Sequence, residues 1–247
     1  MVAYLQAIFE RRERDARQCQ DLFQILRGIS NTDGSPRYDV NTIAGMFISL
    51  MFAGHHTTST TSSWALLELL RHPEWLARVR EELDALYADE REVSYQGAAR
   101  DPAAGELLQG DPAHPSAAHP PDAQGRRAAV RLQRLVDPGR HERGVSIAVS
   151  NRDPALFRDP ARFDPTRYLG DDGAADKHLF GWIPFGAGRH RCVGAPFAMM
   201  QVKAIFSILL RRYDFELAQP SDTYHEDHSK MVVQLKQPCR VRYRRRH

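Results

Sequence analysis

The sequence predicts a mainly α-helical protein with small β-sheets, an α+β fold, on three observations. No proline interrupts residues 42–71, and about 30 residues at 1.5 Å each would form one helix about 45 Å long. Apolar residues recur at helical spacing over 2–27 and 193–212. The short runs 232–235 and 239–243 indicate a terminal pair of strands.

The amino-terminal part is predicted to be helical. Residues 2–27 are expected to form one amphipathic helix, continuous or interrupted, that ends at Gly28. Asp39 or Asn41 can cap the next helix by accepting hydrogen bonds from its first backbone N–H groups. This long helix is apolar nearly all round over 43–53, which predicts that the stretch is buried in something larger.

A surface helix is expected after the long one. Pro73 opens it at its first turn, and charged residues surround an apolar stripe formed by Trp75, Val79, Leu83 and Leu86. Further along, three Asp-Pro pairs punctuate 151–191 and exclude long regular structure. This segment is predicted to be an ordered loop region, which in a compact domain is usually functional.

Composition limits the classes of protein that fit. With 247 residues, 42% apolar and 26% charged, the chain suits one large or two modest domains. The net charge of +3 implies no nucleic-acid partner, and the cationic segment 243–247 is interpreted as a solvated terminus. Cys19, Cys192 and Cys239 show no CxxC spacing, which fits a reducing compartment. Without an apolar window of about 18 residues or a signal-peptide pattern, we expect a cytoplasmic chain with no membrane span, while an anchor upstream of this sequence stays open.

The middle of the chain has an anomalous composition. Residues 97–144 contain no Phe, Tyr, Trp, Ile, Met, Lys, Asn, Thr or Cys, and Gly, Ala, Arg and Pro make up 29 of these 48 residues. We expect this tract to be disordered. It separates a helical segment, 1–96, from a segment of loops, helix and terminal strands, 145–247.

The most informative string, 185–194, reads F-G-A-G-R-H-R-C-V-G. Its cysteine, Cys192, ends a glycine-rich loop and begins a helix, where the positive end of the helix dipole and the neighbouring basic residues favour the thiolate form. Gly188 and Gly194 permit positive φ or the close approach of a flat partner, against which Phe185 can pack. A lone cysteine in a glycine loop would be structural, but the complete F-x-x-G-x-[HR]-x-C-x-G pattern argues against that.

This string resembles the haem-thiolate signature of the cytochrome P450 family. The resemblance implies a b-type haem, held by Phe185, Gly186, Gly188, His190, Cys192 and Gly194. Cys192 would be the axial ligand of the iron, whose thiolate favours O–O bond cleavage. His190 would contact a haem propionate, although by itself it would be a surface histidine. By this resemblance the chain is an incomplete, carboxyl-terminal portion of that fold, from helix I to helix L and the terminal strands.

A second string, 52–58, lies midway along the long helix and resembles the family's oxygen-activation segment, in the form found in sterol 14α-demethylases. Small side chains at Ala53 and Gly54 would leave room for dioxygen beside the iron. The resemblance makes two residues catalytic: the Thr57 hydroxyl can loosen the helix and donate a hydrogen bond, and the His56 imidazole can relay a proton. By themselves, adjacent histidines on an apolar helix are more often core residues.

The same resemblance implies a lipophilic, sterol-like substrate and an electron donor. The substrate would contact Phe52, Ala53 and His56. Apolar residues before the motif, namely Phe47, Met51 and Phe52, would face the sterol or pack in the core, and spacing favours the core. A ferredoxin-type or reductase donor would dock near Arg189, Arg191 and Lys203.

One element of the family pattern is missing. The E-x-x-R of helix K should precede the meander, which 159–168 resembles, but the tract 97–144 lies there instead. The only E-x-x-R, Glu68 to Arg71, ends the long helix and is in the wrong place. Without helix K, we expect Arg162 to be unpaired and one wall of the haem site to be open to water.

Our hypothesis is that the tract is read in a shifted frame of a GC-rich gene. Residues 97–113 can be back-translated so that a shift of one base gives a string containing Lys-Glu-Thr-Leu-Arg. The continuation to residue 121 can give Pro-Pro-Leu-Ile, and both strings resemble the helix K region. The codons of the gene test this: the hypothesis fails if the neighbouring frame encodes no such string.

Three functions therefore stay open. The first is a haem-thiolate monooxygenase like the sterol 14α-demethylases. The second is a non-catalytic, truncated fragment of such an enzyme, with weak or no haem binding. The third is a helical interaction module that uses the long helix, for which the cysteine loop would have to be accidental.

Overall fold

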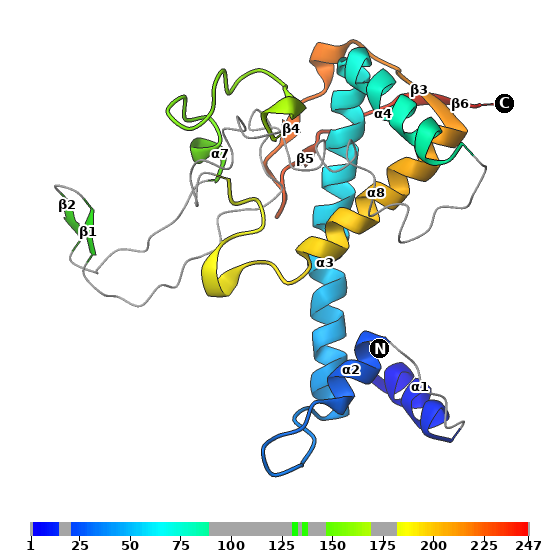
Figure 1. Cartoon of the computed structure of the whole chain (residues 1–247), viewed down its shortest axis with the longest axis vertical. Coiled ribbons are helices and arrows are strands. Elements are labelled where there is room, and N and C mark those ends of the chain that lie inside the picture. The colour runs from blue at the N-terminus through cyan, green and yellow to red at the C-terminus, as the bar shows by residue number, and fades with distance from the viewer. Residues whose placement is uncertain are drawn as a thin grey trace. The chain divides into compact units, whose positions relative to one another are not determined.

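The computed structural model describes residues 2–14, 21–88, 130–132, 135–137, 147–168 and 182–246 (Figure 1). Its helices are α1 Val2–Arg14, α2 Leu22–Gly28, α3 Val40–Arg71, α4 Pro73–Leu86, α7 Ile147–Ser150 and α8 Ala195–Arg212. Three 3-10 turns are η1 Pro165–Tyr168, η3 Gly188–His190 and η4 Ser221–Thr223. With three small two-stranded sheets, this confirms the predicted α+β fold.

All three sheets are antiparallel pairs. They join β1 Val130–Leu132 to β2 Leu135–Asp137, β3 Tyr213–Leu217 to β6 Val241–Arg245, and β4 Glu226–Asp227 to β5 Gln234–Leu235. The prediction that 232–235 and 239–243 pair with each other is wrong, since β5 and β6 lie in different sheets. Strand β6 pairs with β3 because opposite charges and apolar side chains then face each other across the strands, as in Asp214↔Arg244 and Leu217↔Val241.

Local sequence explains where the first helices begin and end. The pattern over 2–27 is interrupted: Asp21 caps a separate helix, α2, by accepting a 3.0 Å hydrogen bond from the Gln24 N–H. Residues 15–20 lie outside the described residues. Helix α2 ends at Gly28 as predicted. Asp39 is the residue that caps α3, because its carboxylate accepts a 2.7 Å hydrogen bond from the Thr42 N–H. Bonds from the side chain and backbone of Thr42 hold the pKa of Asp39 below its ordinary value.

The chain divides into two compact units, Met1–His56 and Thr57–His247. In the first unit, a core of Phe9, Phe23 and Ile43 joins α1, α2 and the start of α3. The Phe9 and Phe23 rings meet edge to face with centroids 5.3 Å apart. Arg12 makes a bidentate ion pair with Asp21, at 3.1 and 2.7 Å.

The core of the second unit is formed by the end of α3, by α4 and by α8. Its buried residues are Leu69, Leu76, Val79, Leu83, Tyr87, Val202, Phe206 and Leu210. The predicted surface helix is confirmed, because one apolar stripe of α4 is buried while Glu74 and Glu81 on the same helix are exposed. The terminal strands are attached to α3 by Trp64, whose indole N–H donates a 3.2 Å hydrogen bond to the Val233 carbonyl.

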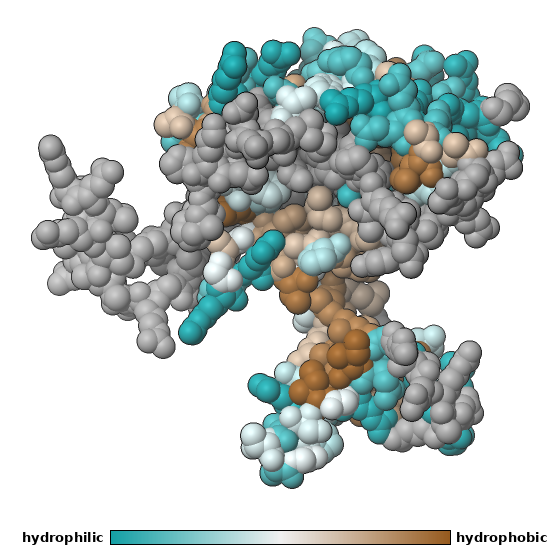
Figure 2. All heavy atoms as spheres, in the orientation of Figure 1, coloured by the Kyte–Doolittle hydropathy of each residue, from teal (hydrophilic) through white to brown (hydrophobic). Residues whose placement is uncertain are grey.

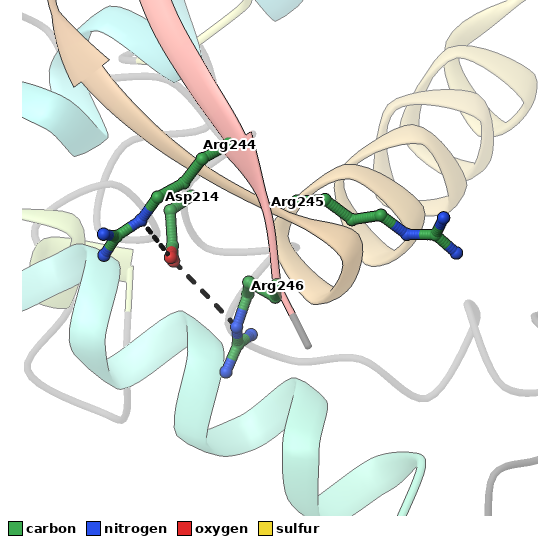
Figure 3. Close-up of a pocket in the computed structure, with 4 residues that line it drawn as sticks. All are labelled: Asp214, Arg244, Arg245 and Arg246. Carbon is green, nitrogen blue, oxygen red and sulfur yellow. Dashed lines mark hydrogen bonds and ion pairs between the residues drawn. The ribbon is translucent and has the colours of Figure 1, made fainter.

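The basic carboxyl terminus is exposed to solvent, as expected, but it forms a strand rather than a free tail. Residues 241–245 form β6, and Asp214 on β3 accepts ion pairs from Arg80 at 3.0 Å and Arg244 at 3.1 Å. Figure 3 shows Arg244 and Arg246 directed toward Asp214, while Arg245 points away from it. These residues line a pocket of about 620 Å³. One carboxylate placed against several guanidinium groups accounts for the ordered strand.

Most of the anomalous tract lies outside the described residues. Within 97–144 the structure describes only β1 and β2, which pair in register Val130↔Asp137. The expectation of disorder therefore stays a prediction for the rest of the tract.

Candidate active site

The predicted ligand loop is held by backbone hydrogen bonds. The Cys192 N–H donates a 2.7 Å hydrogen bond to the Phe185 carbonyl, which closes the loop at its two ends. Gly186 has φ +72°, and a Cβ at this position would lie 3.3 Å from the His190 carbonyl oxygen. Gly188 has φ +62°. Both residues adopt a left-handed conformation that favours glycine, so the glycines of the motif are needed for this shape.

The thiol of Cys192 is free and exposed. Helix α8 begins at Ala195, with Gly194 as its cap, so Cys192 lies just before the helix rather than starting it as predicted. Position 194 adjoins the sulfur: a Cβ there would lie 3.6 Å from the Cys192 Sγ. Glycine at 194 therefore keeps the space next to the sulfur clear.

These features fit a haem-thiolate ligand on one side of the haem. The free thiol supplies one soft donor, and the missing side chain at 194 leaves room for a flat group against the loop. No cluster of three His, Cys, Asp or Glu side chains that could hold a metal occurs in the described part of the chain. His190 is exposed and Phe185 is half-buried, so both side chains are accessible from the loop surface.

The second predicted group lies on α3. Phe52, Ala53, Gly54 and His55 are exposed, whereas His56 is half-buried. The Phe52 and His56 rings meet edge to face at 5.9 Å, and the His55 and His56 rings at 4.9 Å. A Cβ at Gly54 would meet nothing within 4 Å, as expected for an exposed helix position.

Thr57 is half-buried in the second compact unit, while Phe52 to His56 belong to the first. Helix α3 continues unbroken through Thr57. The predicted local loosening of the helix is therefore not seen. The loop of Cys192 also belongs to the second unit.

Burial along α3 differs from the prediction. Met51 is 59% and Phe52 58% exposed, so neither packs in a core. Phe47, by contrast, packs against Phe23 with ring centroids 6.0 Å apart. The stretch 43–53 was expected to be buried throughout, but only Ile43 and Ala44 are. In Figure 2, brown apolar surface marks this part of α3.

The structure gives Glu68 and Arg71 a role that the sequence did not. Glu68 is buried, and its carboxylate pairs with Arg71 at 2.8 Å. Arg71 also donates hydrogen bonds to the carbonyls of Ser221 at 2.7 Å and Tyr224 at 3.2 Å. The E-x-x-R spacing was visible in the sequence as an i, i+3 pair. Through these hydrogen bonds, Arg71 links the end of α3 to the carboxyl-terminal segment.

The meander residues are placed next to this pair. The Phe163 ring stacks on His72 with centroids 4.5 Å apart and an interplanar angle of 24°. Arg162 is exposed, and it does make an interaction in the structure, so the expectation that it is unpaired is wrong.

Of the predicted donor-docking residues, Arg189 and Arg191 are exposed and Lys203 is half-buried. All three lie on the loop of Cys192 or on α8, within one compact unit. No helix in the described part of the chain is long and apolar enough to cross a membrane.

Comparisons with known proteins agree with the family resemblance of the cysteine loop. The family model for cytochrome P450 matches residues 1–100 and 144–243, and residues 101–143, which it leaves out, fall inside the anomalous tract. Two solved structures share the fold: a cytochrome P450DA haem domain (TM-score 0.78, 23% identity, 100% of this chain and 53% of that one) and retinoic acid bound cyanobacterial CYP120A1 (TM-score 0.77, 23%, 99% and 55%).

Named relatives indicate which members of this family the chain resembles. The chain is 50% identical to the sterol 14α-demethylase of Mycolicibacterium vanbaalenii and 48% to that of Mycobacterium tuberculosis, in each case over 92% of this chain and 50% of the relative. It is 33% identical to the sterol 14-demethylase of Arabidopsis thaliana, over 95% of this chain and 49% of that protein.

The fold and the family match therefore place the chain in a class for which haem-thiolate ligation is implied. The chain belongs to the cytochrome P450 family, is close to the bacterial sterol 14α-demethylases, and spans about half the length of the relatives it matches.

Proposed function

We propose that this chain carries the haem-binding and oxygen-activating residues of a monooxygenase that hydroxylates a sterol-like substrate, most like a sterol 14α-demethylase. The observation that carries the proposal is the free, exposed Cys192 thiol, placed at the end of a loop whose shape depends on Gly186 and Gly188. A b-type haem, when bound, supplies the dioxygen and one-electron chemistry.

The loop residues would bind and orient that group. Cys192 would supply the thiolate that holds the iron, since its thiol is free and exposed. His190 would donate a hydrogen bond to a haem propionate. Phe185 and the small residues Gly186, Gly188 and Gly194 would form the surface that holds the flat ring, and position 194 adjoins the ligand, since a Cβ there would lie 3.6 Å from the Cys192 Sγ.

The α3 residues would act on dioxygen and substrate. Ala53 and Gly54 would leave room for dioxygen because their side chains are small. The Thr57 hydroxyl donates a hydrogen bond and the His56 imidazole relays protons from solvent. Phe52, Ala53 and His56 contact the lipophilic substrate.

Electrons would come from a ferredoxin-type or reductase partner on the face formed by Arg189, Arg191 and Lys203. The exposure of both arginines supports a docking surface for an acidic partner. A cytoplasmic location is proposed from the cysteine spacing in the sequence.

A second candidate is a non-catalytic fragment with weak or no haem binding. Its supporting observation is the 58% exposure of Phe52, a predicted substrate contact that remains open to water. The half-length match to the relatives agrees with this candidate.

Haem reconstitution tests both candidates. The full chain is mixed with haem, reduced and exposed to carbon monoxide, and the thiolate-type Soret band is recorded for wild type, Cys192→Ser and Cys239→Ser. Cys239, the matched control, is also a free cysteine. The main proposal predicts a strong band that Cys192→Ser removes and Cys239→Ser leaves unchanged. A weak band or none in wild type would favour the fragment, and a band that survives Cys192→Ser would refute the ligand assignment.

A further inference from the structure

Positive charge exceeds negative charge around Asp214, near the carboxyl-terminal end of the chain. Its carboxylate forms ion pairs with Arg80 at 3.0 Å, Arg244 at 3.1 Å and Arg246 at 3.9 Å. A second carboxylate, that of Asp84, lies 3.5 Å from Arg246. Three arginines thus share two carboxylates, whereas a single arginine can pair with a carboxylate through two parallel hydrogen bonds. The ion pairs therefore leave part of the positive charge uncompensated.

Two arginines at this place keep hydrogen-bond donors that are not in use. Arg244 donates only its Nε–H to Asp214, and its two Nη groups have no hydrogen-bond partner in the described part of the chain. Its side chain is 76% exposed. Arg245 makes no side-chain hydrogen bond or ion pair with any residue that the structure describes, and Figure 3 shows it directed away from Asp214. Both guanidinium groups can therefore donate to a ligand.

These donors border one pocket. Asp214, Arg244, Arg245 and Arg246 line a volume of about 620 Å³ (Figure 3), which falls within the range of about 300–1,000 Å³ typical of small-molecule sites. Part of the pocket is fixed before a ligand arrives: Asp214 holds the Nε of Arg244, and Arg246 donates a 2.9 Å hydrogen bond to the Leu210 carbonyl. Groups that are already oriented lose less entropy on binding.

We propose that this pocket binds a soluble small molecule that carries a diphosphate group. A guanidinium can donate two parallel hydrogen bonds to the oxygens of one phosphate group, and arginine suits this geometry better than lysine. Arg244 and Arg245 extend in different directions from neighbouring positions of β6, so each would hold one phosphate group. The negative charge of the ligand would balance the surplus around Asp214. A monocarboxylate would provide too little charge and only one group to bind.

Other anionic partners fit this place less well. A lipid bilayer presents its phosphates as a broad surface, whereas these arginines border a pocket. The proposed electron-donor surface is formed by Arg189, Arg191 and Lys203, none of which lines the pocket. The pocket also contains no residue of the cysteine loop or of α3. The inference therefore does not depend on the proposed catalysis.

Titration calorimetry of the full chain with inorganic pyrophosphate tests the site. The titration is done without haem and at constant ionic strength, and is repeated with inorganic phosphate. We expect one pyrophosphate to bind per chain, at least tenfold more tightly than phosphate, because two arginines are engaged instead of one. Co-sedimentation with phosphatidic acid vesicles is measured in parallel, and we expect the chain to stay in the supernatant.

Matched variants that each remove one positive charge locate the site. Arg245→Gln removes no observed side-chain contact in the described part of the chain, and it should weaken pyrophosphate binding about tenfold, as expected for lost hydrogen bonds to a charged group. Arg244→Gln should have a similar effect. Arg242→Gln is the control, because Arg242 is exposed on the same strand but faces Glu216 and does not line the pocket. It should change the affinity less than twofold. Circular dichroism confirms that each variant is folded.

Three outcomes overturn the proposal. It is wrong if pyrophosphate does not bind, or if the chain binds phosphatidic acid vesicles but not pyrophosphate. It is also wrong if Arg242→Gln weakens binding as much as Arg245→Gln, because equal losses would show a diffuse attraction between charges instead of a site. Since the titration contains no haem, its failure would leave the haem assignment intact, and a missing thiolate band would leave the pocket intact.

Discussion

The middle of α3 and its carboxyl-terminal end differ in what this chain provides to cover them. Near the end, Leu67 and Leu69 are buried by partners within the same 247 residues, on α4, on α8 and in the terminal segment. In the middle, Met51 and Phe52 have comparable apolarity but remain more than half exposed. The apolar pattern of a helix therefore indicates how much of its surface is suited to burial. Whether that surface is buried depends on which other elements pack against it.

The largest effect should come from shortening a buried side chain near the carboxyl-terminal end of α3. Leu69→Ala removes a fully buried side chain and should lower the free energy of unfolding by about 2–5 kcal/mol. Met51→Ala, in the uncovered stretch, should change it by less than about 0.5 kcal/mol. Urea unfolding of the full chain measures both. Equal losses of unfolding free energy in the two variants would mean that the middle of α3 is packed in solution as well as its end.

A smaller effect is expected at the ion pair that fixes the end of α3. Arg71→Ala leaves the Glu68 carboxylate buried without its 2.8 Å partner and removes the bonds to Ser221 and Tyr224, so it should cost about 2–3 kcal/mol. Arg78→Ala is the matched control, because Arg78 pairs with Glu82 at 3.5 Å with 42% of its side chain exposed. It should cost less than about 0.5 kcal/mol. Similar losses for the two variants in urea unfolding would show that Glu68 is hydrated.

How much the sequence could predict follows the same division. Helices α3, α4 and α8 were predicted almost to their ends, because apolar periodicity and caps such as Asp39 are local signals. The cysteine loop was identified because ten adjacent residues carry it. The partners of β5 and β6 were missed because pairing joins residues far apart: Phe215 faces Tyr243.

Glu68 and Arg71 show a different limit. Their spacing was seen, but it was compared with a family element expected elsewhere, so its local role as an i, i+3 ion pair was overlooked. The burial of 43–53 could not be predicted from the stretch itself, since nothing within those residues states whether a covering segment is present. The gap in the family match at 101–143 agrees with the frame-shift hypothesis, which the codons still have to test.

The cysteine loop offers a more local test. Gly186→Ala should lower the free energy of unfolding by about 1–2 kcal/mol, because alanine is strained at φ +72° and its Cβ would approach the His190 carbonyl to 3.3 Å. It should also change the rate at which a thiol reagent modifies Cys192. Gly28→Ala is the control, since Gly28 ends α2 with nothing within 4 Å. An unchanged Cys192 rate in Gly186→Ala would mean that the loop shape does not depend on this glycine.

The smallest effect is a pH dependence in the first unit. A side-chain hydrogen bond from Arg12, and then the Gln24 N–H, hold the pKa of Asp21 below its ordinary value of 3.8. Because the folded pKa is depressed, this stabilisation is present above about pH 4 and is lost as the pH falls through the folded pKa.

Asp21→Asn keeps a capping side chain but removes the charge. Hydrogen exchange of the α2 amides should therefore be slower in wild type than in Asp21→Asn at pH 6, after correction for intrinsic rates. The difference should shrink toward zero below pH 4. Asp33 and Asp39, whose pKa values are also lowered, contribute equally to both proteins and cancel. A difference that persists unchanged at pH 3 would show that the ion pair with Arg12 does not stabilise the unit.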